Sequence, residues 1–130
     1  MTSIEFQVER RASYAYVRCR GTYSLEALLH VNEAALDAAA HESLKAALVD
    51  LRDVGGGPPT TLERYEFGVH MAKLQSDPGR RLLLAVVGHE PMVDPRRFGE
   101  IVARNRGAVG RVFTDIDEAS AWIDKELANE

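Results

Sequence analysis

The stretch LKAALVDLRDVGGGPPTTLE, residues 44–63, decides the fold of this 130-residue chain. Its apolar run, residues 46–51, shows no clear alternation, which is typical of a parallel strand covered on both faces. Asp50 interrupts the run. We expect its carboxylate to have partners or to lie near the strand end, because burying an unpaired carboxylate is costly.

The second half of this stretch predicts a loop that leads directly into a helix. Three glycines, residues 55–57, free the backbone, and Pro58 and Pro59 stiffen the exit. Thr60 is the expected N-cap, and Glu63 completes a capping box with it. Ligands of open α/β sheets bind where a strand's carboxyl end meets a helix N-terminus, and the free N–H groups there favour an anion. A plain crossover loop with a good cap explains the same residues.

Two later arginines join this loop in the predicted anion site. Asp94 followed by Pro95 is typical of the N-cap and first position of a helix, which would place Arg96 and Arg97 in its first turn. Cations are unfavourable at that end of a helix, so the placement indicates recognition of phosphate or carboxylate. Solvated surface arginines are the alternative. The expected anion-binding residues are Gly56, Gly57, Thr60, Thr61, Arg96 and Arg97.

The remaining segments predict a single α/β domain over residues 1–130. Alternating apolar residues indicate a hairpin at a sheet edge, and LLLAVV at 82–87 indicates the central strand. The expected strands cover residues 4–8, 13–20, 46–51, 82–87 and 111–113. The expected helices cover about 24–41, 60–75, 94–106 and 115–127. The order β-β-α-β-α-β-α-β-α predicts a mixed, mostly parallel five-stranded sheet with one antiparallel edge strand and four helices.

The helix after Thr60 carries two apolar stripes on opposite sides. One consists of Leu62, Tyr65, Val69 and Ala72, and the other of Phe67, Met71 and Leu74. One stripe suffices to cover a core, so either neighbouring helices or a partner must cover the second. We expect Phe67, Met71 and Leu74 to contact a protein partner or a second copy of the chain.

Composition and charge limit the classes of function. The net charge of -4 argues against general nucleic-acid binding, although residues 80–111 hold seven arginines against three acids. The single cysteine, Cys19, excludes an internal disulfide and fits a reducing compartment. The N-terminus lacks a signal-peptide segment, and no apolar run approaches the roughly 18 residues of a membrane span. We therefore expect a cytoplasmic protein.

Motifs for nucleotide, metal and acyl-transfer chemistry do not occur in the sequence. The loop has prolines where a Walker loop needs its lysine, and the histidines lack zinc spacing. Glu63, Glu66 and His70 could share a helix face as metal ligands, but a surface pair explains them more simply. His89 and Glu90 fit a solvated loop pair better than an acid–base pair. We expect neither an enzyme nor a bound metal or cofactor.

Four pieces of the sequence together carry a resemblance to a known family. They are LVDLRDV (48–54), ERYEFG (63–68), FGEIVARNRG (98–107) and RVFTDIDEASAWI (111–123), of which the last is the most specific. In this order, over nearly the whole chain, they resemble the STAS-like domains, and within them the SpoIIAA-like proteins related to anti-sigma-factor antagonists. The resemblance implies a cytoplasmic, non-catalytic regulatory domain that binds a protein partner or itself.

The resemblance also implies two features of the site. In the antagonists, a partner kinase phosphorylates a serine of an aspartate-serine-serine-glycine motif that opens the helix after the third strand. This chain has Pro59, Thr60, Thr61 and Leu62 there, so Thr60 and Thr61 are phosphoacceptors by position only, where a phosphate would meet a helix N-terminus. SpoIIAA-like relatives are also compared with lipid-transfer domains of the CRAL-TRIO kind. The alternative function is therefore binding of an anionic small molecule or a lipid.

Overall fold

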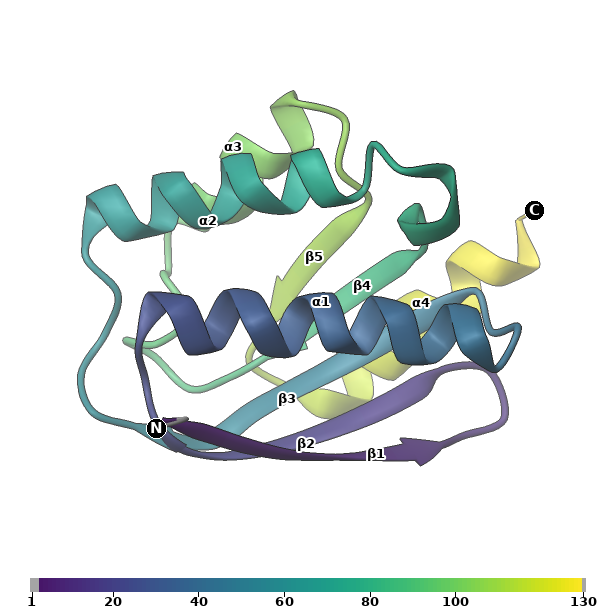
Figure 1. Ribbon diagram of the computed structural model, residues 1–130, viewed down its shortest axis with the longest axis horizontal. Helices are drawn as coiled ribbons and strands as arrows, with labels where there is room; N and C mark the ends of the chain where they lie inside the picture. Colours follow the sequence, from purple (N-terminus) through teal and green to yellow (C-terminus); the bar gives the residue numbers. More distant parts are fainter. Residues whose placement is uncertain (1–2, 130) are drawn as a thin grey trace.

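In the computed structural model, which describes residues 3–129, five strands form one mixed sheet (Figure 1). The strands are β1 (Ile4–Arg10), β2 (Ala15–Thr22), β3 (Ala46–Gly55), β4 (Leu83–Val87) and β5 (Gly110–Phe113). They lie in chain order across the sheet; β1 pairs antiparallel with β2, and each later pair is parallel. The predicted sheet with one antiparallel edge strand is confirmed. Residues 1, 2 and 130 of the predicted domain lie outside the described residues.

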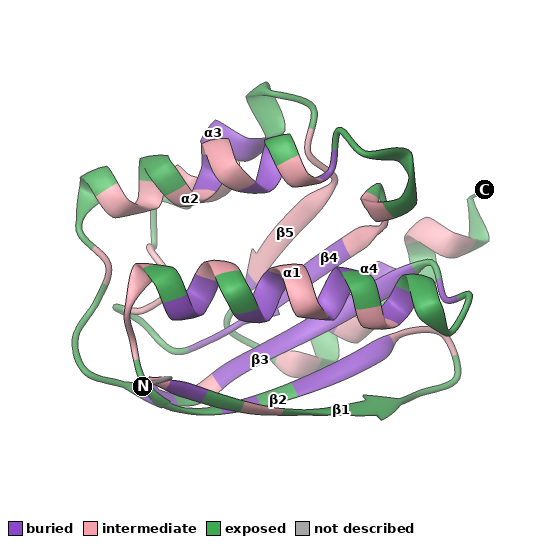
Figure 2. Cartoon of the chain, in the orientation of Figure 1, coloured by how far each residue is buried: buried purple, intermediate pink, exposed green. Residues whose placement is uncertain are grey.

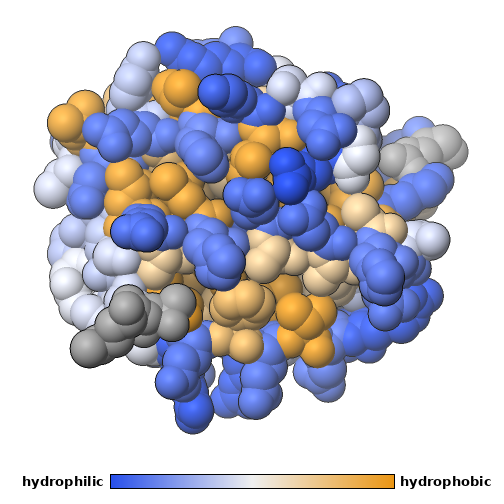
Figure 3. All heavy atoms as spheres, viewed as in Figure 1, coloured by the Kyte–Doolittle hydropathy of each residue, from blue (hydrophilic) through white to orange (hydrophobic). Residues whose placement is uncertain are grey.

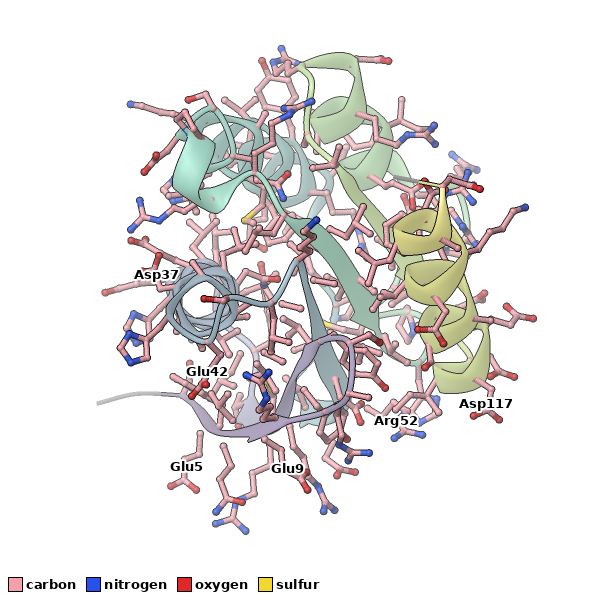
Figure 4. All side chains as sticks on the ribbon, turned by 90° about the vertical axis from the view of Figure 1, so that its right-hand side faces the viewer. Glu5, Glu9, Asp37, Glu42, Arg52 and Asp117 are labelled. Atoms are coloured by element: carbon pink, nitrogen blue, oxygen red, sulfur yellow. The ribbon has the colours of Figure 1, made fainter. Side chains whose placement is uncertain are left out.

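The helices cover both faces of this sheet unequally. They are α1 (Leu25–His41), α2 (Thr61–Leu74), α3 (Phe98–Asn105) and α4 (Ile116–Ala128), with a short 3-10 helix η1 (Pro78–Arg80). From β2 to β5, each new strand is added at the same edge of the sheet, next to the strand before it. Right-handed crossovers between these strands therefore place α1, α2 and α3 on the same face. Helix α4 follows the last strand and is free to cover the other face, as the view along the sheet shows (Figure 4).

The core lies on both sides of β3, which is buried along most of its length (Figure 2). Ala47, Val49 and Leu51 pack toward α1 and α2. Ala46 and Leu48 pack on the opposite face, toward α4. This two-sided burial explains why the strand's sequence lacks alternation.

Asp50 of β3 is a buried charge in the core, with 4% of its surface exposed. The Tyr16 hydroxyl donates to it at 2.6 Å, and the Arg52 guanidinium donates two hydrogen bonds at 2.9 and 2.7 Å. Burial by itself would raise the pKa of the Asp50 carboxyl, but the hydrogen bonds from Arg52 and Tyr16 outweigh it and lower that pKa. The carboxylate therefore has the partners that its position requires.

Candidate functional site

The N-terminus of α2 begins where β3 leaves the sheet, and a capping box closes it. The Glu63 amide donates to the Thr60 hydroxyl at 3.1 Å, and the Thr60 amide donates to the Glu63 carboxylate at 2.9 Å. The predicted cap is confirmed. The Glu63 carboxylate already occupies the place on the Thr60 amide that an external anion would take, so anion binding at Thr60 and Thr61 stays a prediction.

The glycines before this helix shape the turn. Gly56 and Gly57 have φ of 91° and 93°, in the left-handed region that favours glycine. A Cβ on Gly56 would clash with the Thr22 side chain. Gly57 borders a shallow hollow that it shares with Arg52 and His89. The loop's backbone geometry thus accounts for these two glycines without a bound anion.

The placement expected for Arg96 and Arg97 in the first turn of a helix is wrong. Helix α3 begins at Phe98, and Arg97 occupies the N-cap position with a left-handed φ of 54°. The Asp94 carboxylate accepts from the amides of Arg96 and Phe98 at 3.1 and 3.0 Å, which makes a separate turn ahead of the helix. The unfavourable contact between these arginines and a helix dipole, which motivated the anion site, therefore does not arise in the predicted form.

The expected roles of the two stripes on α2 are exchanged. Met71 is only 2% exposed, and Phe67 and Leu74 pack against the core between the sheet and α1. Met71 is therefore a core residue, with Phe67 and Leu74 packed against the core, and the prediction that the three form an uncovered partner interface is wrong. The physical reason is that α2 lies between two neighbours and buries this stripe on the sheet while another side contacts α3.

The other stripe of α2 remains partly exposed. Leu62 and Tyr65 are 64% and 41% exposed, and Ile101 of α3 is 47% exposed. Among residues 3–129, these are three of the four exposed large hydrophobic side chains; the fourth is Val8 of β1. We call Leu62, Tyr65 and Ile101 the α2–α3 patch.

Arg106 contacts Tyr65, one residue of this patch. Its guanidinium lies 5.4 Å from the centre of the Tyr65 ring and donates to the Tyr65 hydroxyl at 3.2 Å. Both contacts are partly exposed to solvent, so their contribution to stability is small. Their effect is to favour one orientation of the exposed Tyr65 ring.

Two glycines bring α2 and α3 together beneath the patch. A Cβ added at Gly68 would lie 2.7 Å from the Gly99 carbonyl oxygen and 2.8 Å from Val102 Cβ. Only a residue without a side chain permits this approach. The two helices therefore form one closely packed platform.

A small cavity lies on the opposite side of α2, between this helix, α1 and the carboxyl end of the sheet. Its volume is about 70 Å³, and Tyr23, Leu28 and Phe67 are among its lining residues. Figure 3 shows hydrophobic side chains at the surface between α1 and α2, where both helices begin. Arg97 lines this cavity, whereas Arg96 is exposed outside it, so the structure does not bring the two predicted arginines into one site.

Residues 3–129 lack the features of a membrane-spanning helix and of a metal site. No helix in this part of the chain is both long and apolar enough to cross a membrane. The same residues contain no group of three histidine, cysteine or acidic side chains that could hold a metal ion. Cys19 is buried, and burial raises the pKa of its thiol to about 12.

Comparison with known proteins identifies the class of fold. No protein-family model and no curated protein matches the sequence. Among solved structures, the chain is similar to an anti-sigma factor antagonist from Mycobacterium paratuberculosis, with a TM-score of 0.58 and 19% identity over 95% of this chain and 96% of that one. A second similar structure is an uncharacterized protein with a SpoIIAA-like fold from Shewanella loihica, with a TM-score of 0.49 and 16% identity over 95% of each chain. The chain thus has the STAS/SpoIIAA-like fold that its sequence resembles.

Several contacts of the fold and of the site could not be found from the sequence. The partners of Asp50 come from another strand and from a residue two positions on, so only the need for partners was predictable. The Glu100 carboxylate accepts a hydrogen bond from the Val112 amide at 2.8 Å, on the outer edge of β5. No local sequence pattern predicts this contact. The sequence does not show whether Tyr65 or Met71 is exposed, because both residues lie on apolar stripes of α2.

Proposed function

We propose that this protein is a non-catalytic regulatory domain that binds a protein partner through the α2–α3 patch. The observation that carries the proposal is the concentration of exposed large hydrophobic side chains on α2 and α3. Exposed apolar side chains that cluster on adjacent elements, with polar residues around them, are typical of interaction sites. The cytoplasmic location predicted from the sequence remains part of this proposal.

The composition of the patch supports this role. Tyrosine and arginine are enriched among residues that dominate binding energy, and Tyr65 already contacts Arg106. A side chain held in one orientation loses less entropy when a partner binds. The close contact between Gly68 and Gly99 keeps the two helices in a fixed relation, so the surface is presented ready for docking.

The shared fold adds support of a general kind. The similar protein from Mycobacterium paratuberculosis is named as an antagonist of an anti-sigma factor, which makes it a regulator of another protein. At 19% identity the likeness shows the fold alone, so the function is proposed from the exposed side chains of the α2–α3 patch. The proposal requires a protein partner with an apolar docking surface.

A modification at the start of α2 would act next to this patch. Thr61 and Leu62 are adjacent exposed residues of the first turn, and the Thr60 hydroxyl caps the Glu63 amide. A phosphate on Thr60 would remove that cap and face the Glu63 carboxylate, which repels it. We therefore favour Thr61 over Thr60 as the phosphoacceptor, since its modification leaves the capping hydroxyl in place.

The test compares acidic substitutions inside and outside the patch. The double variant Leu62→Glu, Ile101→Glu is expected to lose association with proteins captured from native cell extract, while Val8→Glu retains it. Val8 is the matched control because its exposure, 47%, equals that of Ile101. Sedimentation of each purified variant measures its mass in solution. A dimer mass identifies the partner as a second copy of the chain, and a monomer mass identifies it as a different protein. Equal capture by the double variant and by Val8→Glu would contradict the proposal.

Binding of a long lipid chain is not supported by the cavity. Its volume of about 70 Å³ lies well below the roughly 300 Å³ at which ordinary ligand pockets begin. We therefore keep protein binding as the proposed function and treat the cavity separately.

A further inference from the structure

The cavity beneath α2 is a different site from the α2–α3 patch, because it lies on the inner side of the helix. Most of its wall is apolar and comes from α1, β3, α2, β4, β5 and the loop after β4. The residues concerned are Leu28, Leu51, Phe67, Val86, Met92 and Val112. About 70 Å³ holds roughly two waters or a molecule of about five heavy atoms.

Tyr23 supplies a polar group to this apolar space. Its ring lines the cavity, and its hydroxyl is buried without a hydrogen-bond partner among the described residues. A buried hydroxyl left unpaired costs stability that an occupant with a suitable group would recover. Burial, and then the charge and hydrogen-bonding influence of the nearby Glu63 carboxylate, raise the pKa of Tyr23 to about 12, so the hydroxyl keeps its proton. Glu63 does not reach the geometry of a full hydrogen bond, so an occupant with an acceptor oxygen can accept a hydrogen bond from this hydroxyl in competition with it.

The charges around the cavity disfavour an anion. Glu63, Asp94 and Glu100 line it together with Arg64 and Arg97. Arg64 already donates to the carbonyls of Pro91 and Met92 at 2.8 and 3.0 Å. It is therefore committed to the loop that closes this end.

Arg97 is the remaining arginine, and it lies 3.9 Å from the Glu100 carboxylate. The lining thus carries three acids against two arginines, both of which already have partners. An entering carboxylate would meet a net negative charge, which disfavours it.

We propose that this cavity binds a small uncharged molecule of about five heavy atoms, largely apolar, whose carbonyl or ether oxygen accepts a hydrogen bond from Tyr23. The apolar wall takes the hydrocarbon part, and the hydroxyl fixes its orientation. This site goes beyond the proposed protein binding, and neither depends on the other.

The experiment titrates 2-butanone into the full chain and follows the methyl signals of the cavity by NMR. Butanone has five heavy atoms and one carbonyl acceptor. We expect saturable shifts at Met92, Val86 and Val112, and a dissociation constant about threefold to tenfold weaker in Tyr23→Phe. Tyr14→Phe is the matched control, because the Tyr14 hydroxyl lies on the α4 side, 3.3 Å from Ser120 Oγ. Propionate, of similar size but charged, is expected to give no saturable shift.

The outcomes separate the proposal from its alternatives. Linear shifts that do not saturate, or equal affinity in wild type and Tyr23→Phe, would overturn it. Saturable binding of propionate as tight as that of butanone would overturn the uncharged class of ligand. Tyr23→Phe should fold at least as stably as wild type, since it removes an unpaired buried hydroxyl. The double variant Leu62→Glu, Ile101→Glu should bind butanone as wild type does. A negative result for butanone would therefore overturn the cavity proposal and leave the proposed protein-docking surface standing.

Discussion

The Tyr16 hydroxyl lies 2.6 Å from Oδ2 of Asp50, on the sheet face that α4 covers. The contact joins β2 to β3, and Arg52 completes it with two further hydrogen bonds to the same carboxylate. Breaking a buried charged pair by removing one partner is far more costly than the pair's net contribution. The network is therefore a sensitive point of the fold, although it lies away from the patch and the cavity.

The first prediction concerns the tyrosine of this network. Tyr16→Phe removes one of the two donors to Oδ2 of the buried Asp50 carboxylate and leaves only Arg52 on that oxygen, so we expect the free energy of unfolding to fall by about 1–3 kcal/mol. Urea denaturation monitored by circular dichroism measures the change. Tyr14→Phe serves as the control, because its longer, partly exposed hydrogen bond predicts a change of under about 0.5 kcal/mol. Equal losses in the two variants would contradict the importance of the Tyr16–Asp50 contact.

Acid should weaken the same network. The folded pKa of Asp50 is lowered, so the unfolded chain binds the proton more readily. The stabilisation is therefore complete above the unfolded pKa of about 3.9 and is lost as the pH falls through the folded pKa. Thermal unfolding of wild type and Asp50→Asn, followed from about pH 6 downward, measures it. We expect the variant to be less stable at pH 6 and the difference to shrink below about pH 4; a constant difference would contradict this account.

The platform of α2 and α3 depends on Gly68. Gly68→Ala places a methyl group 2.7 Å from the Gly99 carbonyl oxygen, so the helices must separate, and we expect a loss of about 1–3 kcal/mol. Gly55→Ala is the matched control, since a Cβ there meets nothing within 4 Å. Chemical denaturation compares the two. If Gly68→Ala is as stable as Gly55→Ala, the close approach of the helices is not what holds the platform.

The capping box at the start of α2 gives a further prediction. Thr60→Ala removes the acceptor of the Glu63 amide and should cost about 1 kcal/mol, whereas Thr60→Ser keeps the hydroxyl and most of the stability. Unfolding midpoints of the three proteins provide the measurement. A Thr60→Ser variant as unstable as Thr60→Ala would show that the methyl group, and not the hydroxyl, stabilises this turn.

The sequence predicts the fold well because its local signals agree with one another. The buried run at 46–51 and the Thr60–Glu63 capping box both occur where their patterns place them. Each depends on residues a few positions apart, so neighbouring chemistry is enough to specify it. The antiparallel edge also follows from local alternation and a short turn.

The site is predicted less well because it depends on contacts between distant segments. Asp94 and Pro95 match the pattern of a helix start. The Asp94 carboxylate instead accepts a hydrogen bond from the Phe98 amide, and α3 begins only at Phe98. The two stripes of α2 have similar composition, and only the positions of the sheet and of α3 decide which is buried. Met71 faces the core and Tyr65 the solvent for that reason alone. A single sequence does not contain that information.

Hydrogen exchange of the protein bound to its captured partner tests the central claim most directly. If the α2–α3 patch is the docking surface, amides of residues 61–69 and 98–105 should exchange more slowly in the complex, while those of β1 and α4 stay unchanged. Protection confined to β1 or α4, with α2 and α3 exchanging as in the free protein, would contradict the account.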